Sequence, residues 1–110
     1  MKVGIIGAGT MGSGIAQAFA MTDGYEVCLC DIKEEYAEGG KAKIQKNMNF
    51  LVSKEKITQE KADEIMGKIT TGLNNICGDC DLIVEVALEK LEITKILIYF
   101  FYSSYAFFSW

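Results

Sequence analysis

A glycine-rich motif near the N-terminus constrains the fold of this chain more than any other feature of its sequence. The motif reads Gly-Ala-Gly-Thr-Met-Gly over residues 7–12, and it follows the short apolar run Val3–Ile6. In such a turn the first glycine permits a tight bend, the second lets the backbone approach a pyrophosphate, and the third lets helix and strand pack closely. A helix starting here would also present free N–H groups and the positive end of its dipole to phosphates.

The residues after the motif provide the context that a dinucleotide-binding turn requires. Apolar residues recur at helical spacing, and Gly24 is expected to end the helix; the apolar face comprises Met11, Ile15, Ala18, Phe19 and Thr22, with Ala16 and Ala20 between them. A second strand then ends at Asp31, about 20 residues after Gly12. This acid can accept hydrogen bonds from an adenosine ribose and would repel the 2′-phosphate of NADP, so the sequence predicts NAD binding. A glycine-rich turn in another α/β fold is the alternative.

Charge and composition exclude several kinds of function. The chain has 110 residues, enough for one small domain, and a net charge of −4 that gives no electrostatic footprint for nucleic acid. No block of like charges suggests a basic membrane patch. The sequence contains no histidine, the commonest general base and metal ligand. Any catalysis would therefore depend on Asp, Glu, Lys, Cys or Tyr.

The cysteines and the N-terminus bear on metal binding and on the cellular compartment. Cys77 and Cys80 have a C-x-x-C spacing that could hold a metal or act as a redox pair, whereas Cys28 and Cys30 alternate in an apolar strand. Burial as small apolar side chains is the favoured interpretation, and no metal site is predicted. The N-terminal apolar run resembles a secretory signal, but its glycines interrupt it and fit the nucleotide turn instead. The sequence therefore predicts a cytoplasmic protein.

A two-helix excursion is predicted after the second strand. Apolar residues indicate an amphipathic helix over about residues 33–52, and Thr58 is a plausible N-cap for a second helix with Glu60 in its first turn. The lysines are expected on a solvated face; they are Lys41, Lys43, Lys46, Lys54, Lys56 and Lys61.

Past the excursion, the pattern predicts a short strand over 69–71, a loop over 72–79 and a buried parallel strand over 82–86. Glu85 is expected near the C-terminal end of that strand, and a helix is expected from Ala87 to Lys95. The fold class predicted is therefore α/β, an incomplete Rossmann-type parallel sheet with a two-helix excursion after the second strand.

Residues 96–110 differ from the rest of the chain because they carry no charge and are rich in aromatics. They are fewer than the roughly 17–25 residues that a membrane-spanning helix needs, so no membrane span is predicted. An aromatic segment of this kind would be an exposed apolar patch unless it finds a partner, and self-association through it is one expectation.

Residues 1–95 closely resemble the N-terminal NAD-binding domain of 3-hydroxyacyl-CoA dehydrogenases, most of all the bacterial 3-hydroxybutyryl-CoA dehydrogenases. The resemblance rests on the glycine motif within residues 6–20, on Asp31-Ile-Lys, on the helical excursion, and on Cys80-Asp-Leu-Ile-Val-Glu-Val-Ala-Leu-Glu89. It implies an oxidoreductase of fatty-acid metabolism that converts L-3-hydroxyacyl-CoA to 3-oxoacyl-CoA with NAD, or runs the reverse reduction. Residues 1–95 would form the NAD-binding domain, and residues 96–110 an aromatic tail unlike the family.

The resemblance also implies roles for particular residues. Glu89 matches an acid near the nicotinamide end of the cofactor. Lys56 matches a lysine that contacts CoA, and Asn49 aligns with a position held by serine in many members. The diphosphate would be held by Gly7, Ala8, Gly9, Thr10, Met11 and Gly12, and the adenosine ribose by Asp31.

The catalytic part of the family is not found in these 110 residues. In the family, a strand with an Asn-Thr-Ser-Ser-like segment, a histidine base with a glutamate partner, and a helical C-terminal domain follow the matched region. We therefore expect a chain truncated after about residue 95, with no catalytic residue of its own and little or no activity alone. The alternatives are a non-catalytic interaction module that uses its aromatic tail, and a fragment of a 3-hydroxyisobutyrate-type dehydrogenase.

Overall fold

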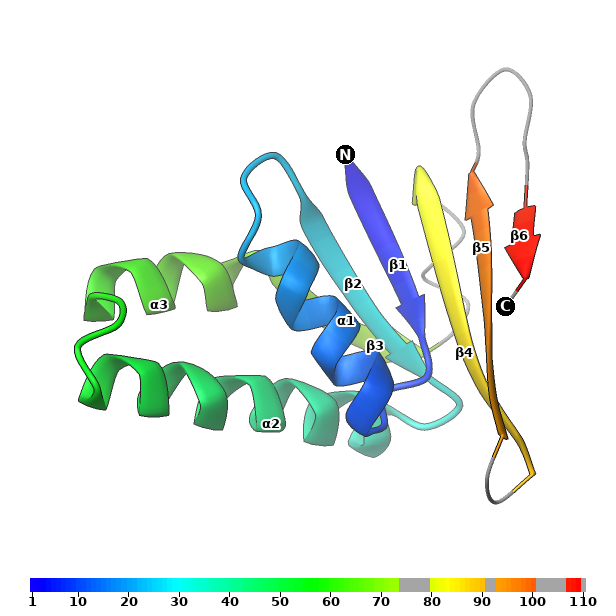
Figure 1. The fold of residues 1–110 in the computed structure, drawn as a ribbon, viewed down its shortest axis with the longest axis horizontal. Helices are drawn as coiled ribbons and strands as arrows, with labels where there is room; N and C mark the ends of the chain where they lie inside the picture. Colours follow the sequence, from blue (N-terminus) through cyan, green and yellow to red (C-terminus); the bar gives the residue numbers. More distant parts are fainter. Residues whose placement is uncertain (74–79, 91–92, 101–106, 110) are drawn as a thin grey trace.

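The computed structural model describes residues 1–73, 80–90, 93–100 and 107–109, which form one mixed sheet with helices packed against it (Figure 1). The strand order is β3-β2-β1-β4-β5-β6, and the first four strands in that order run parallel. The strands are β1 (Lys2–Ile6), β2 (Glu26–Asp31), β3 (Ile69–Leu73), β4 (Leu82–Lys90), β5 (Ile93–Phe100) and β6 (Phe107–Ser109). The helices are α1 (Thr10–Ala20), α2 (Glu34–Ser53) and α3 (Gln59–Gly67). This confirms the predicted α/β class with a Rossmann-type parallel sheet.

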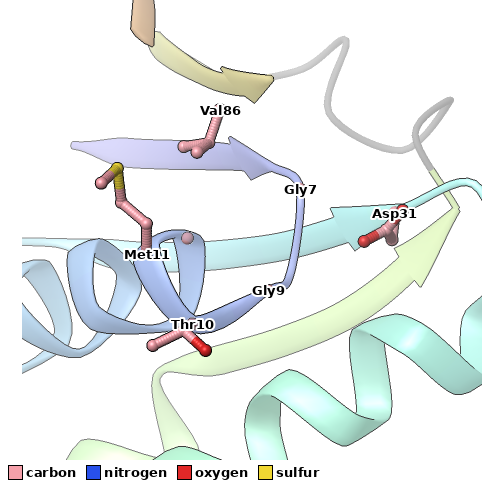
Figure 2. A pocket seen from close by; sticks show the side chains of 7 residues that line it. Gly7, Gly9, Thr10, Met11, Asp31 and Val86 are labelled. Atoms are coloured by element: carbon pink, nitrogen blue, oxygen red, sulfur yellow. The ribbon is translucent and has the colours of Figure 1, made fainter. Parts of the chain in front are cut away.

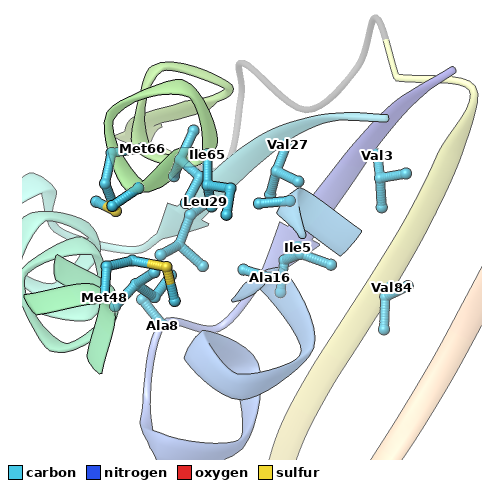
Figure 3. Close-up of a cluster of buried hydrophobic side chains, with 14 of the residues drawn as sticks. Val3, Ile5, Ala8, Ala16, Val27, Leu29, Met48, Ile65, Met66 and Val84 are labelled. Carbon is cyan, nitrogen blue, oxygen red and sulfur yellow. The ribbon is translucent and has the colours of Figure 1, made fainter. Parts of the chain in front are cut away.

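The core lies between the helices and one face of the parallel strands. Alternate residues of a strand point to opposite faces, and Val27 and Leu29 of β2 both join the helix-side cluster, as do Val3 and Ile5 of β1. Figure 3 shows these side chains together with Ala16, Met48, Ile65 and Met66 from the helices. Ile44 of α2 belongs to the same cluster. The other face of the sheet carries a smaller cluster of Cys28, Cys30 and Cys80, with Ile6 and Ile83 packed against it.

Helix α1 contacts the sheet mainly through small residues. Its buried positions are Gly12, Ser13, Ala16 and Ala20, whereas Met11 is 46% exposed. Small side chains let the helix axis approach the strands closely, and larger apolar residues such as Ile15 and Phe19 fill the flanks of the contact. The prediction of the helix was correct, and of the residues at helical spacing Ile15 and Phe19 pack against the core whereas Met11 is exposed.

The end of α1 also differs from the prediction. The helix ends at Ala20 with Met21 as its C-cap, and Gly24 lies beyond it with a φ of 91°, in the turn before β2. The Lys68 ammonium donates hydrogen bonds of 2.8 Å to the carbonyls of Ala20 and Thr22. A lysine between α3 and β3 therefore donates to these carbonyls. In a helix that ends with a glycine cap, backbone N–H groups would do so instead.

The two-helix excursion has the predicted form. Thr58 caps α3, since its Oγ1 accepts a 3.1 Å hydrogen bond from the Lys61 N–H, and Glu60 lies in the first turn. The prediction of a solvated lysine face is wrong for Lys41, whose ammonium donates to the Ile69 carbonyl at 2.9 Å in a partly buried position. This contact fastens α2 to the start of β3.

The helix predicted from Ala87 to Lys95 is not formed. Instead β4 continues to Lys90, and β5 pairs with it in antiparallel orientation, with Val86 opposite Ile96 and Val84 opposite Ile98. Residues 93–100 are mainly β-branched and aromatic, a composition that favours a strand once a partner strand is available. Glu85 is therefore inside β4, although it is the last β4 residue paired with β1, opposite Ile6.

The loop predicted over 72–79 was wrong at its start, because Gly72 and Leu73 belong to β3 and pair with β2. Residues 74–79, including Cys77, lie outside the described part of the chain. None of the described helices combines the length and the apolar composition that crossing a membrane would need.

We predict that Lys68→Met lowers the free energy of unfolding by about 1–2 kcal/mol, because the carbonyls of Ala20, in a partly buried contact, and of Thr22, in an exposed one, lose a charged donor. Urea denaturation followed by circular dichroism measures the difference. Lys61→Met is the matched control, since Lys61 makes only exposed ion pairs of 3.7 and 3.8 Å, and it should change stability by less than about 0.5 kcal/mol. Equal effects of the two substitutions would refute the capping role.

Candidate functional site

The candidate site is built around the start of α1, at the carboxyl edge of β1. Gly9 is the N-cap of the helix, and no side chain caps it. The first intrahelical bond runs from the Ser13 N–H to the Gly9 carbonyl at 2.9 Å. The N–H groups of Thr10, Met11 and Gly12 precede it and have no partner within the helix. Together with the helix dipole, these groups form a binding position for an anion.

The three glycines of the motif differ in what surrounds them. A Cβ on Gly12 would lie 1.6 Å from the Gly7 carbonyl oxygen, so only glycine lets α1 pack on the turn. Gly7 has a φ of 106°, and a Cβ there would lie 2.6 Å from the Val86 carbonyl oxygen. A Cβ on Gly9 would meet no atom within 4 Å. The open space is thus beside the second glycine, where the sequence predicts that a diphosphate approaches the backbone.

Asp31 connects the end of β2 to the glycine-rich turn. Its Oδ2 accepts a 2.9 Å hydrogen bond from the Ala8 N–H, and its Oδ1 accepts a 2.7 Å bond from the Ile32 N–H. The Gly7 N–H donates to the Cys30 carbonyl at 2.8 Å, so the turn is held to β2 at two successive residues. A carboxylate offers about four lone-pair positions, which leaves Asp31 able to accept further hydrogen bonds.

A cavity of about 660 Å³ lies over this turn (Figure 2). It is lined by Gly7, Gly9, Thr10, Met11, Gly12, Asp31 and Val86. A second hollow of about 300 Å³ adjoins it, lined by Ala8, Gly9 and Asp31 together with the α2 residues Glu35, Tyr36, Gly39, Gly40 and Lys43. The structure therefore brings together all six turn residues and the acid that the sequence singled out. A volume of this order is typical of sites for small molecules and cofactors.

Three other predicted site residues lie elsewhere in the chain. Asn49 is exposed on α2, where its Oδ1 accepts a 2.9 Å bond from Gln45, and Lys56 is exposed in the turn between α2 and α3. That turn is at the far end of α2 from the glycine-rich turn (Figure 1). Glu89 belongs to β4, beyond the segment paired with β1, and its side chain lies outside the described part. Neither Asn49 nor Lys56 lines the cavity or the adjoining hollow.

The sequence predictions missed Val86, Ser13 and Gly40. Val86 forms a wall of the cavity because β4 runs on past the end of β1. Ser13 is buried with its Oγ donating to the Ala8 carbonyl at 3.0 Å. Gly40 brings α2 against the same carbonyl, since a Cβ there would lie 2.8 Å from the Ala8 oxygen. The sequence signal that could have identified Ser13 is its polar side chain among the small residues on one face of α1.

The buried cysteines lie on the opposite face of the sheet from the helices. The Sγ atoms of Cys28 and Cys30 are 3.4 Å apart, and Cys80 packs in the same cluster. Burial raises the pKa of the Cys28 thiol, while Lys2 and a hydrogen bond with Cys80 act in the opposite direction. In the described ranges, no three His, Cys, Asp or Glu side chains gather in a way that could hold a metal ion.

Comparison with known proteins agrees with this geometry. The sequence model of the family described as "3-hydroxyacyl-CoA dehydrogenase, NAD binding domain" matches residues 2–99. The chain is 42% identical over 95 residues to a probable 3-hydroxybutyryl-CoA dehydrogenase of Deinococcus radiodurans, covering 84% of this chain and 33% of that protein. It is 38% identical over 96 residues to the 3-hydroxybutyryl-CoA dehydrogenase of Bradyrhizobium diazoefficiens, covering 86% and 32%.

A solved structure shows the same fold. The (S)-3-hydroxybutyryl-CoA dehydrogenase from Ralstonia eutropha superimposes with a TM-score of 0.75 and 34% identity, covering 83% of this chain and 32% of the other. The chain thus spans about a third of the length of the relatives it matches.

Substitution of two glycines on α1 tests the packing at the site. We predict that Gly12→Ala destabilises the fold by about 3 kcal/mol or more, because the added Cβ would overlap the Gly7 carbonyl. Gly14→Ala is the matched control: a Cβ there meets nothing within 4 Å, so the variant should gain about 0.5–1 kcal/mol from helix propensity. Thermal unfolding distinguishes the two, and a stable Gly12→Ala variant would contradict the close approach of α1 to the turn.

Proposed function

This chain belongs to the 3-hydroxyacyl-CoA dehydrogenase family, and we propose that it serves as the NAD-binding part of an enzyme that interconverts L-3-hydroxyacyl-CoA and 3-oxoacyl-CoA. The observation that carries the proposal is the convergence of an uncapped helix start, the glycine-rich turn and the Asp31 carboxylate on one cavity. The family match identifies the cofactor as NAD.

The diphosphate of NAD is proposed to lie beside Gly9. The open space there admits it, and the N–H groups of Thr10, Met11 and Gly12 can donate hydrogen bonds to its oxygens. Among the residues whose side chains the structure describes, no basic one lines the larger cavity, so backbone donors and the dipole of α1 would balance the two negative charges. The residues present therefore fit the group.

The adenosine ribose is proposed to bind at Asp31. Its two carboxylate oxygens each accept one backbone N–H, and the lone pairs that remain can accept the ribose hydroxyls. The negative charge of Asp31 would repel a 2′-phosphate, and Glu35 in the adjoining hollow adds to that repulsion. Lys43 in the same hollow opposes it, but the two carboxylates outnumber the single ammonium. NAD is therefore expected to bind more tightly than NADP.

In the chemical step NAD would accept the hydride, and the residues described above would bind and orient the cofactor. Glu89 is proposed to lie toward the nicotinamide end, because β4 passes the cavity at Val86 before reaching it. Lys56 and Asn49 are proposed to contact the CoA moiety, since both are exposed on the two-helix excursion. The 110 residues contain no histidine, so the histidine base that the family resemblance implies is not among them. We expect this chain alone to have little or no dehydrogenase activity.

Location and assembly belong to the same proposal. We propose that the protein is cytoplasmic and that the uncharged residues 96–110 contribute to self-association, because they are rich in apolar and aromatic side chains. Sedimentation velocity at several concentrations tests the second point. A chain that stays monomeric throughout would refute it.

Isothermal titration with NAD tests the cofactor site, with Asp31→Asn as the decisive variant. We predict a loss of about tenfold in NAD affinity and a smaller preference for NAD over NADP, because asparagine removes a charge and an acceptor while keeping the shape of the side chain. Asp23→Asn makes the same change at a 94% exposed position and should leave both affinities unchanged. If the folded wild-type chain shows no heat of binding with NAD, the proposed cofactor site is wrong.

A further inference from the structure

We propose that Ser13 is a positioning residue that directs the Gly9 N–H toward the diphosphate of the cofactor. The inference rests on the proposed function and extends it to a side chain that does not line the cavity. Within the part of the chain whose side chains the structure describes, Ser13 is the buried polar residue, with 4% of its surface exposed. A buried hydroxyl is costly unless it is hydrogen-bonded, and this one has a single well-placed acceptor, the Ala8 carbonyl at 3.0 Å.

The effect on Gly9 follows from the geometry of the peptide bond. The C=O of Ala8 and the N–H of Gly9 belong to one peptide unit, which is planar and trans, so the two groups point in opposite directions. Ser13 holds the carbonyl inward, between α1 and α2. The Gly9 N–H therefore points away from this buried contact, and Gly9 itself lines the cavity.

The preceding peptide unit, between Gly7 and Ala8, is held in the opposite orientation. The Ala8 N–H donates to Asp31, so the Gly7 carbonyl of the same unit points the other way, toward α1. The 1.6 Å separation between that oxygen and a Cβ built on Gly12 agrees with this direction. Two successive peptides of the turn are thus held from opposite sides, one by Asp31 and one by Ser13.

Helix α2 protects the Ser13 contact from competition. A Cβ on Gly40 would lie 2.8 Å from the Ala8 oxygen and 2.9 Å from the Ser13 Oγ, so the α2 backbone covers both atoms. Without the hydroxyl, the Ala8 carbonyl would be a buried acceptor that loses the side-chain donor described for it, and rotation of the peptide toward water would relieve that cost. The rotated peptide would present a carbonyl oxygen to the diphosphate in place of an N–H.

A purely steric role makes a different prediction. If Ser13 is present only because a small residue is needed where α1 meets α2, alanine should serve as well for ligand binding. If Ser13 acts through the peptide, its loss should affect ligands that carry a diphosphate and spare ligands that lack one. The ratio of the two affinities separates these roles, because general destabilisation would weaken both ligands.

The experiment measures the affinities of the full chain for ADP-ribose and for adenosine by NMR titration, with wild type and Ser13→Ala. We expect Ser13→Ala to weaken ADP-ribose about tenfold and to change adenosine less than about twofold, in line with the loss of one hydrogen bond and the misdirection of its peptide. Ser13→Cys keeps a weaker donor at the same position, so its affinity for ADP-ribose should lie between those of wild type and Ser13→Ala. If the alanine variant does not fold, the cysteine variant is judged by the same ratio.

Ser53→Ala is the matched control, since Ser53 also donates to a backbone carbonyl, that of Phe50 at 2.7 Å, but at an exposed position on α2. It should leave both affinities unchanged. An unaltered affinity ratio in the folded Ser13 variants, whether the two ligands keep their affinities or weaken equally, would overturn the inference. Failure of the wild-type chain to bind ADP-ribose or NAD would instead refute the proposed function, so the two failures are distinguishable.

Discussion

The hydrogen bond between the Asp31 carboxylate and the Ala8 N–H is the interaction on which the site depends. Because β1 and β2 are parallel and adjacent, their carboxyl ends meet at one edge of the sheet, and a turn leaving β1 passes the last residue of β2. The 2.9 Å bond fixes that passage, and the Gly7 N–H to Cys30 carbonyl bond reinforces it. The turn is thereby held in shape by the protein itself, so a ligand does not have to order it on binding.

The close approach of three backbone segments explains why small residues gather at the turn. Gly12 admits the Gly7 carbonyl, and Gly40 admits the Ala8 carbonyl, so α1 and α2 both touch the turn directly. Ala16 and Ala20 continue the same contact along α1. The large apolar residues that stabilise the fold lie mainly on β1, β2, α2 and α3. This distribution of small and large residues determines where α1 starts and therefore where its first N–H groups point.

The sequence was most informative where a local signal fixes the backbone. The glycine motif and the Thr58 cap act through neighbouring residues, and the acid that ends β2 reaches the turn, 23 residues away in sequence, through the parallel pairing of β1 and β2; the structure places all three as predicted. Lys68 could not be anticipated in this way, because its contact with the end of α1 joins residues 46 and 48 positions apart. The buried positions of α1 are small residues, which hydropathy alone does not single out.

The region after Val86 shows the limit of periodicity as a guide. Helical spacing of Leu88, Leu91 and Lys95 indicated a helix, but the same residues can form a hairpin, and the choice depends on whether a second strand with strong β propensity follows. Residues 93–100 provide that strand, so β4 extends beyond β1 and Val86 becomes a wall of the cavity. The diphosphate and ribose positions, in contrast, are built almost entirely from β1, α1 and β2, whose contacts are close in sequence. A site of this kind can therefore be inferred from its first 31 residues, whereas the wall that faces it depends on how the later strands pair.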